Sequence, residues 1–251
     1  MVIIIASGGW QSSIPASAGN FAQEYYLKAF NRWVGRGYVV AMIEHSDGSN
    51  VTPNTATGSY AYSNVLEWYD QYRAYWNAQS GYGANFPICA TGFSSGGHMS
   101  LMLGAGRPAL DCVVVEGPPS RVNYVAGTTH APGLRQDVQN LADQTFSGAI
   151  GVSPIAAWSP QTQQSTYGRL RMPILIGHAN NDPLILPRQT HTFCPRTSTT
   201  CRAEYLDAGS GSVSDYDFTH ANVNNQDLLD FRAKERSWAC AIVRAWTGPC
   251  S

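Results

Sequence analysis

Short apolar runs rich in β-branched residues alternate along the chain with longer segments in which apolar residues recur every three or four positions. The short runs predict strands at residues 2–6, 38–43, 87–91, 112–116, 173–178 and 202–207. The longer segments predict helices at about 21–35 and 60–79, from Ser95 onward, and at about 225–246. This alternation is typical of β-α-β units, so we expect an α/β fold with a mostly parallel central sheet flanked by helices. No repeat or linker divides the sequence, which predicts a single domain over residues 1–251.

One stretch interrupts the alternation, between the fourth and fifth predicted strands. Residues from about 118 to 171 are rich in Pro, Gly and Gln. A connection of that length within a compact domain is usually functional, so it predicts a lid or a wall of a binding site. The alternative interpretation is an ordinary crossover helix with long flanking loops.

Composition narrows the possible functions. The 251 residues include 16 Lys and Arg against 17 Asp and Glu, for a formal net charge of -1, while 43% of the residues are hydrophobic. This balance excludes a disordered chain and gives no basic surface of the kind that nucleic-acid binding requires. The longest apolar runs, 2–6 and 38–43, are far shorter than the roughly 20 residues of a membrane-spanning helix.

The six cysteines suggest disulfide bonds. They are Cys89, Cys112, Cys194, Cys201, Cys240 and Cys250. The close spacing of Cys194 with Cys201, and of Cys240 with Cys250, predicts two local disulfides, whereas the bonding of the two cysteines in apolar runs stays open. No pair has C-x-x-C spacing, so we expect no metal site. The cysteines favour a secreted or periplasmic protein, here in a mature form because Met1 leads directly into a strand-like run; the alternative is a cytoplasmic protein with free thiols.

A nucleophile motif follows the third predicted strand. The strand ending at Thr91 leads into Gly92-Phe93-Ser94-Ser95-Gly96, which satisfies G-x-S-x-G and precedes a helix. Small residues on both sides of Ser94 allow a tight strand-to-helix turn, and that turn holds the hydroxyl above the sheet at the helix N-terminus. The motif therefore predicts Ser94 as a nucleophile; the alternative is a plain helix N-cap. His98, four residues further along the helix, is expected to serve packing.

With this motif in this context, the sequence resembles the α/β-hydrolase superfamily, whose catalytic groups occur in the order Ser, acid, His. The resemblance implies Asp182 as the acid, because it lies in Asn180-Asn181-Asp182-Pro183 directly after the fifth predicted strand. It implies His220 as the base, because this residue lies between the last strand and the last helix. Three other aspartates are rival acids: Asp207, Asp215 and Asp217.

The resemblance also implies an oxyanion hole. One donor would be the backbone N–H of Ser95, the residue after the nucleophile. The second would be the N–H of Gly9 or Trp10, because Ser7-Gly8-Gly9-Trp10 resembles the His-Gly-Gly-Gly type of oxyanion loop, with Ser7 in place of the customary His. Aromatic residues are candidates for the substrate pocket, with core packing as the alternative for each: Phe93, Tyr124 and Trp158.

We therefore expect a serine carboxylic-ester hydrolase that acts through an acyl-enzyme and requires no cofactor. A weaker likeness to cutinase-like polyester hydrolases suggests polymeric or short acyl esters, and polysaccharide acetyl or feruloyl esterases are equally compatible. Two alternatives remain. A peptidase of the prolyl-oligopeptidase type would cleave aminoacyl anilides, and a non-catalytic binding protein on a hydrolase scaffold would not react with fluorophosphonates.

Overall fold

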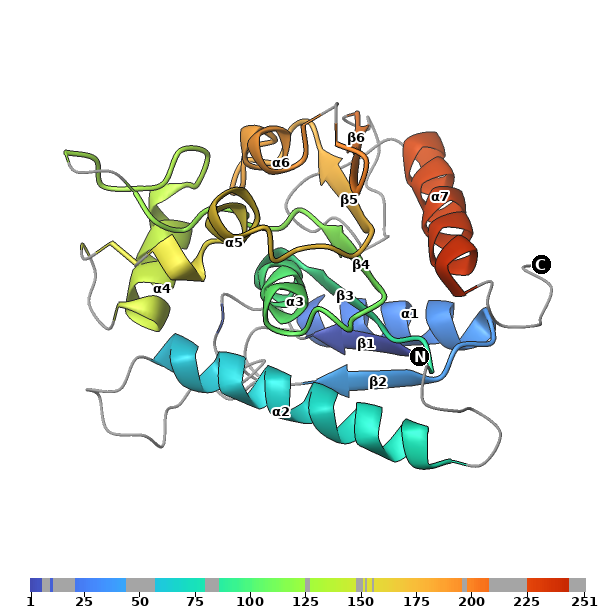
Figure 1. The fold of residues 1–251 in the computed structure, drawn as a ribbon. Helices are drawn as coiled ribbons and strands as arrows, with labels where there is room; N and C mark the ends of the chain where they lie inside the picture. Colours follow the sequence, from blue (N-terminus) through green and yellow to red (C-terminus); the bar gives the residue numbers. More distant parts are fainter. Residues whose placement is uncertain are drawn as a thin grey trace.

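A parallel sheet forms the centre of the molecule in the computed structural model (Figure 1). The structure describes residues 1–5, 10, 21–43, 57–79, 86–124, 127–147, 151, 153–154, 156–195, 198–207 and 225–243. Within these residues, six strands pair in the order β2-β1-β3-β4-β5-β6, and every pair is parallel. Their bounds are β1 (Val2–Ile5), β2 (Val40–Ile43), β3 (Cys89–Phe93), β4 (Cys112–Glu116), β5 (Ile174–Ala179) and β6 (Cys201–Leu206). The α/β fold expected from the sequence is confirmed.

Helices connect the strands. They are α1 (Phe21–Gly35), α2 (Thr57–Ala78), α3 (Ser94–Gly106), α4 (Gln136–Phe146), the short 3-10 helix η1 (Ala156–Trp158), α5 (Pro160–Tyr167), α6 (Arg188–Phe193) and α7 (Asn225–Val243). The four predicted helices correspond to α1, α2, α3 and α7, with ends that differ by three residues or fewer. None of the described helices has both the length and the apolar character that crossing a bilayer requires.

Both faces of the sheet are buried. On β1, Val2 and Ile4 pack against α1, while Ile3 and Ile5 point to the opposite face and join the main core. This alternation follows from the two-residue period of a strand, and it explains why the strands read as continuous apolar runs. Helices α1 and α7 cover one face, and α3 covers the other with α2 packed on it (Figure 1). α3 is buried along nearly its whole length.

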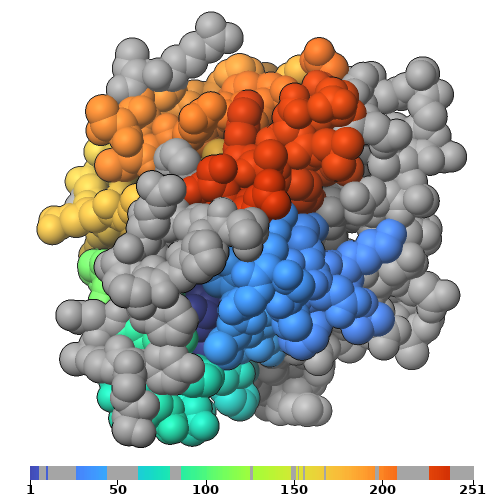
Figure 2. All heavy atoms as spheres, turned by 90° about the vertical axis from the view of Figure 1, so that its right-hand side faces the viewer, coloured from blue at the N-terminus to red at the C-terminus, as the bar shows by residue number. Residues whose placement is uncertain are grey.

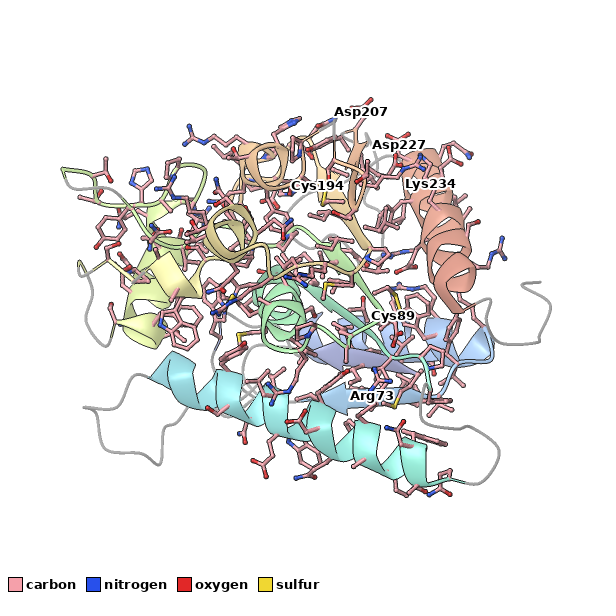
Figure 3. The ribbon with its side chains drawn as sticks, viewed as in Figure 1. Arg73, Cys89, Cys194, Asp207, Asp227 and Lys234 are labelled. Carbon is pink, nitrogen blue, oxygen red and sulfur yellow. A yellow bond between two sulfur atoms is a disulfide. The ribbon has the colours of Figure 1, made fainter. Side chains whose placement is uncertain are left out.

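Two disulfides link neighbouring elements (Figure 3). Cys194 and Cys201 are bonded, as predicted, and they close the turn between α6 and β6. Cys89 and Cys112, whose bonding the sequence left open, are also bonded. They begin β3 and β4 and are direct partners in the parallel register, with Cα atoms 4.5 Å apart. The bond between Cys240 and Cys250 stays a prediction, because Cys250 lies outside the described residues.

A buried cluster of charged side chains joins α1 and α7 to the end of β4. Arg232 of α7 binds Glu116 through two hydrogen bonds of 2.6 and 3.0 Å. Glu235, also on α7, accepts a hydrogen bond of 3.0 Å from Arg36 and lies 3.4 Å from Nε of Arg32. Both carboxylates are fully buried. Figure 2 shows α7 lying directly against α1, where this cluster forms their contact.

Breaking this cluster should destabilise the protein. Glu235→Gln removes one of the two carboxylates that balance the guanidinium groups of the cluster and takes the ionised partner from Arg36. We therefore expect a loss of about 3–5 kcal/mol in the free energy of unfolding, measured by urea denaturation at pH 7. Burial alone would raise the pKa of Glu235, but Arg32, Arg232 and Arg36 outweigh burial and lower it. The ionised carboxylate therefore stabilises the fold at pH values above about 4.3, and this contribution is lost as pH falls through the lowered pKa.

The matched control is Glu204→Gln, which removes the carboxylate that pairs with Lys234 at the surface between β6 and α7. That pair is partly exposed, so its loss should change the free energy of unfolding by less than about 1 kcal/mol. Equal losses in the two variants, or the same acid destabilisation in Glu235→Gln as in the parent, would contradict the role given to the cluster.

Candidate active site

Ser94 lies at the turn between β3 and α3 in a strained backbone conformation. Its φ is 52°, and among the described residues it is one of two non-glycine residues with a positive φ. A left-handed conformation is unfavourable for a side chain with a Cβ and is concentrated at functional sites. The G-x-S-x-G motif thus produces the tight turn that the sequence predicted, with Ser94 itself partly exposed and the residue after it buried.

Gly92 shows why the motif needs small residues. A Cβ at Gly92 would lie 2.5 Å from the backbone carbon and oxygen of Gly96, a distance at which real atoms overlap. Strand β3 and helix α3 therefore approach each other backbone to backbone, which no larger residue at position 92 would permit. This close approach places the first N–H groups of α3, including that of Ser95, next to the nucleophile, and helix N-terminal N–H groups favour a developing negative charge.

Trp10, the second described non-glycine residue with a positive φ, lies beside this turn. Its φ is 64°, its side chain is buried, and it follows β1. β1 lies between β2 and β3 in the sheet. The chain therefore forms β2 on one side of β1 and then crosses to form β3 on the other side. Residues that follow β1 and β3 meet at such a switch point, which is where α/β sheets bind ligands. The indole Nε1 of Trp10 donates a hydrogen bond of 3.1 Å to Nδ1 of His98 on α3. Gly9, the other candidate donor, lies outside the described residues.

Asp182 occupies a buried turn just after β5. Its Oδ1 accepts hydrogen bonds of 2.9 Å from the backbone N–H groups of Leu184 and Ile185, which fix the carboxylate in place. His178, the next-to-last residue of β5, is fully buried and binds the carbonyl of Ile185 at 2.7 Å and the hydroxyl of Thr190 at 2.7 Å. No role was predicted for His178 from the sequence; in the structure it holds the loop that carries Asp182.

Comparison with known proteins identifies the fold. No protein-family model matches the chain, and no curated protein matches it in sequence. Among solved structures, an esterase from Rhizomucor miehei is similar with a TM-score of 0.66 and 13% identity, over 97% of this chain and 74% of that one. A carboxylesterase from Lactobacillus plantarum has a TM-score of 0.63 and 12% identity, over 99% and 87%. An acetyl ester-xyloside bifunctional hydrolase from Caldicellulosiruptor lactoaceticus has a TM-score of 0.60 and 13% identity, over 96% and 82%.

These similarities extend over nearly the whole chain and agree with the parallel sheet and the strand-to-helix turn at Ser94. The chain has the α/β-hydrolase fold. The resemblance drawn from the G-x-S-x-G motif is confirmed at the level of the fold. In this α/β-hydrolase fold, Ser94 follows β3 and Asp182 follows β5, with β4 between them. Neighbouring strands lie about 4.8 Å apart, so two strand spacings leave room for an imidazole between the two side chains.

His220 lies outside the described residues. It belongs to the connection between β6 and α7, which is where the base of an α/β-hydrolase is expected. Of the rival acids, Asp207 is exposed at the end of β6, where its Oδ1 accepts a hydrogen bond of 2.7 Å from Asn180. The other two, Asp215 and Asp217, also lie outside the described residues.

The excursion between β4 and β5 contains a crossover helix and a packed insertion. α5 is the crossover helix on α3, and the residues before it form an insertion in which α4 packs on α2 (Figure 1). The buried side chain of Gln189 accepts hydrogen bonds from the N–H groups of Ser120 and Arg121 and donates to the carbonyls of Arg121 and Pro132. Helix α4 lies beyond the carboxyl ends of β1 and β2 (Figure 1).

The three pocket candidates have different surroundings in the structure. Phe93 packs in the core with Val2, Ile4 and Trp33, because the strand period turns its side chain toward α1, and this favours the alternative of core packing. Tyr124 is half-buried, and its backbone N–H is held by Ser153 in the insertion.

Trp158 is half-buried in η1 and stacks on Phe146 with ring centroids 5.2 Å apart. Phe146 was not singled out in the sequence. Phe146 is a buried residue in the last turn of α4, and its sequence position indicates a core residue and nothing more.

Proposed function

We propose that this protein is a serine hydrolase of carboxylic esters that acts through an acyl-enzyme. The observation that carries the proposal is Ser94, held at a φ of 52° on a turn that Gly92 makes possible by admitting the backbone of Gly96. Such a turn raises a serine hydroxyl toward a substrate beside helix N–H groups. The similar structures from Rhizomucor miehei and Lactobacillus plantarum are described as an esterase and a carboxylesterase, which supports an ester as the substrate.

The proposed reaction divides ester hydrolysis into two steps. Oγ of Ser94 forms a bond to the ester carbonyl carbon while its proton passes to the neutral imidazole of His220. Collapse of the tetrahedral intermediate breaks the bond to the alcohol, which takes this proton and leaves. Water then attacks the acyl group on Ser94, with His220 again as base. The second product is the carboxylic acid, and the free serine is restored.

The other groups stabilise charge in this scheme. Asp182 would orient the imidazole of His220 and offset its positive charge; its own buried position, with Oδ1 held by two N–H groups, suits a fixed carboxylate. The oxyanion would be bound by the N–H of Ser95 and by that of Gly9 or Trp10, each donor being worth about 3 kcal/mol in the activation barrier. The proposed steps require no cofactor.

We also propose that the chain forms one domain and acts outside the cytoplasm. Two disulfides, Cys89–Cys112 and Cys194–Cys201, support an oxidising compartment, because such bonds persist in secreted and periplasmic proteins and are rare in the cytosol.

A fluorophosphonate probe tests the proposed function directly. We expect stoichiometric modification of Ser94, located by peptide mass analysis, because the phosphonate reacts with an activated serine and its oxygen occupies the oxyanion hole. A panel of p-nitrophenyl esters and aminoacyl p-nitroanilides should show turnover of the esters alone. Failure to label Ser94 with an intact fold would indicate a non-catalytic protein, and faster cleavage of the anilides would indicate a peptidase.

A further inference from the structure

His98 is fully buried one helical turn beyond Ser94, and both of its ring nitrogens are hydrogen-bonded. Nδ1 lies 3.1 Å from Nε1 of Trp10, and Nε2 lies 2.8 Å from the carbonyl oxygen of Trp158. An indole N–H can only donate and a carbonyl oxygen can only accept, so the two partners define the tautomer. The ring is neutral in this arrangement, with its proton on Nε2 and its lone pair on Nδ1 facing Trp10.

These contacts belong to an aromatic cluster of Trp10, His98, Phe146 and Trp158. Trp10 meets His98 and Phe146 edge to face, each with ring centroids 5.5 Å apart. Phe146 lies 5.2 Å from His98 and 5.2 Å from Trp158. The cluster joins Trp10 and the nucleophile helix α3 to α4 and η1. Ring packing alone leaves the orientation of the rings adjustable. His98 adds directional hydrogen bonds to Trp10 and to the backbone of Trp158.

The backbone of Trp10 needs such support. A φ of 64° is unfavourable for a bulky residue by about 1–3 kcal/mol and persists only where the surroundings impose it. The direction of the N–H groups on either side of Trp10 depends on this conformation. An oxyanion donor acts only when it lies about 2.7–3.1 Å from the oxyanion, so a small rotation of the loop removes most of its effect.

We propose that His98 is a positioning residue for the oxyanion hole: by accepting the indole hydrogen bond of Trp10 and donating to the carbonyl of Trp158, it holds Trp10 in its left-handed conformation. The inference rests on the proposed esterase function. It assigns to His98 a role that acts through Trp10, without contact between His98 and the substrate.

The test is a set of variants compared by steady-state kinetics on a p-nitrophenyl ester. His98→Leu removes both hydrogen bonds and replaces the imidazole with an apolar side chain of similar size. We expect kcat to fall about ten- to a hundredfold with KM within about twofold of the parent, because the oxyanion contact is made in the transition state only. His98→Asn keeps an acceptor near the position of Nδ1 and should retain kcat within about threefold of the parent.

Two further variants separate positioning from packing. Trp10→Phe removes the indole N–H but keeps a ring, and combined with His98→Leu it should lower kcat no further than either change alone, because both remove the same interaction. Phe146→Leu weakens the same aromatic cluster without touching the hydrogen bond, so it should lower the melting temperature and leave kcat within about threefold of the parent.

The outcomes distinguish this inference from the proposed function. If the parent neither hydrolyses esters nor reacts with fluorophosphonate at Ser94, the esterase proposal fails and the role of His98 fails with it. If the parent is active and His98→Leu lowers the melting temperature while kcat stays within threefold, His98 is a core residue only. Equal losses of kcat in His98→Asn and His98→Leu, or additive losses in the double variant, would also overturn the positioning role.

Discussion

Ser94→Ala is expected to lower kcat on a p-nitrophenyl ester by several powers of ten, on the order of 10⁵- to 10⁶-fold. Alanine has no oxygen to form the acyl-enzyme, so only the oxyanion donors and substrate binding remain to accelerate attack by water. The fold should survive, because alanine differs from serine only by the missing hydroxyl and meets the same backbone strain at a φ of 52°. The measurement is kcat by product absorbance, with circular dichroism and the melting temperature as checks on folding.

Ser100→Ala is the matched control for this variant. Ser100 lies on the same buried helix, α3, and its hydroxyl donates a hydrogen bond of 2.8 Å to the carbonyl of Gly96 within the helix. Its loss should cost about 1 kcal/mol of stability and leave kcat within about threefold of the parent. A residual rate of Ser94→Ala within tenfold of the parent would show that another group is the nucleophile. Comparable losses of kcat in both variants would show that any substitution in α3 disturbs activity, so the loss in Ser94→Ala would not identify the nucleophile.

The strands were predictable from the sequence because of where they lie. β1 and β4 are buried on both faces, so each reads as an unbroken apolar run, and the observed bounds differ from the prediction by two residues or fewer. Helix α1 was predicted over its full length because its apolar stripe faces one side of the sheet. Within the excursion, α4 and α5 were not resolved from the sequence, since their buried positions include Gln139 and Gln163, which the polar pattern assigns to solvent.

Contacts between residues far apart in the chain could not be predicted from the sequence. The bond between Cys89 and Cys112 depends on the register of β3 against β4, which brings together two residues at the starts of separate strands. The hydrogen bond between Arg36 and Glu235 joins residues 199 positions apart, and neither residue carries a local sign of its partner. His98 was expected to pack, which it does; its bond to Trp10 spans 88 positions and became visible only in three dimensions.

The candidate site was predictable to the extent that its geometry is local. The strand-to-helix turn follows from Gly92, Ser94 and Gly96 because the close approach that requires the glycines occurs within five residues. The position of Asp182 after β5 followed from strand order. Phe93 was a pocket candidate with core packing as the alternative, and the strand period, which turns its side chain toward α1, favours core packing.

Asp182→Asn is expected to lower kcat by about 10⁴-fold while the loop keeps its shape. The Oδ1 atom of Asp182 accepts the N–H groups of Leu184 and Ile185, and the carbonyl oxygen of asparagine can accept the same two bonds. The amide lacks the negative charge that offsets the imidazolium of His220 and favours the tautomer able to take the proton of Ser94. Turnover of a p-nitrophenyl ester and the rate of phosphonate labelling of Ser94 should fall together, with an unchanged circular dichroism spectrum.

Asp207→Asn makes this experiment decisive, because Asp207 directly follows the next strand, β6, and was a rival for the same role. Asp207 is exposed, and its Oδ1 is engaged by Asn180, so an amide there should change kcat by no more than about threefold. If Asp207→Asn loses activity and Asp182→Asn keeps it, the acid follows β6 and the turn after β5 is structural. If neither variant loses more than tenfold, the imidazole is held by an aspartate of the connection between β6 and α7, and variants of Asp215 and Asp217 identify which one.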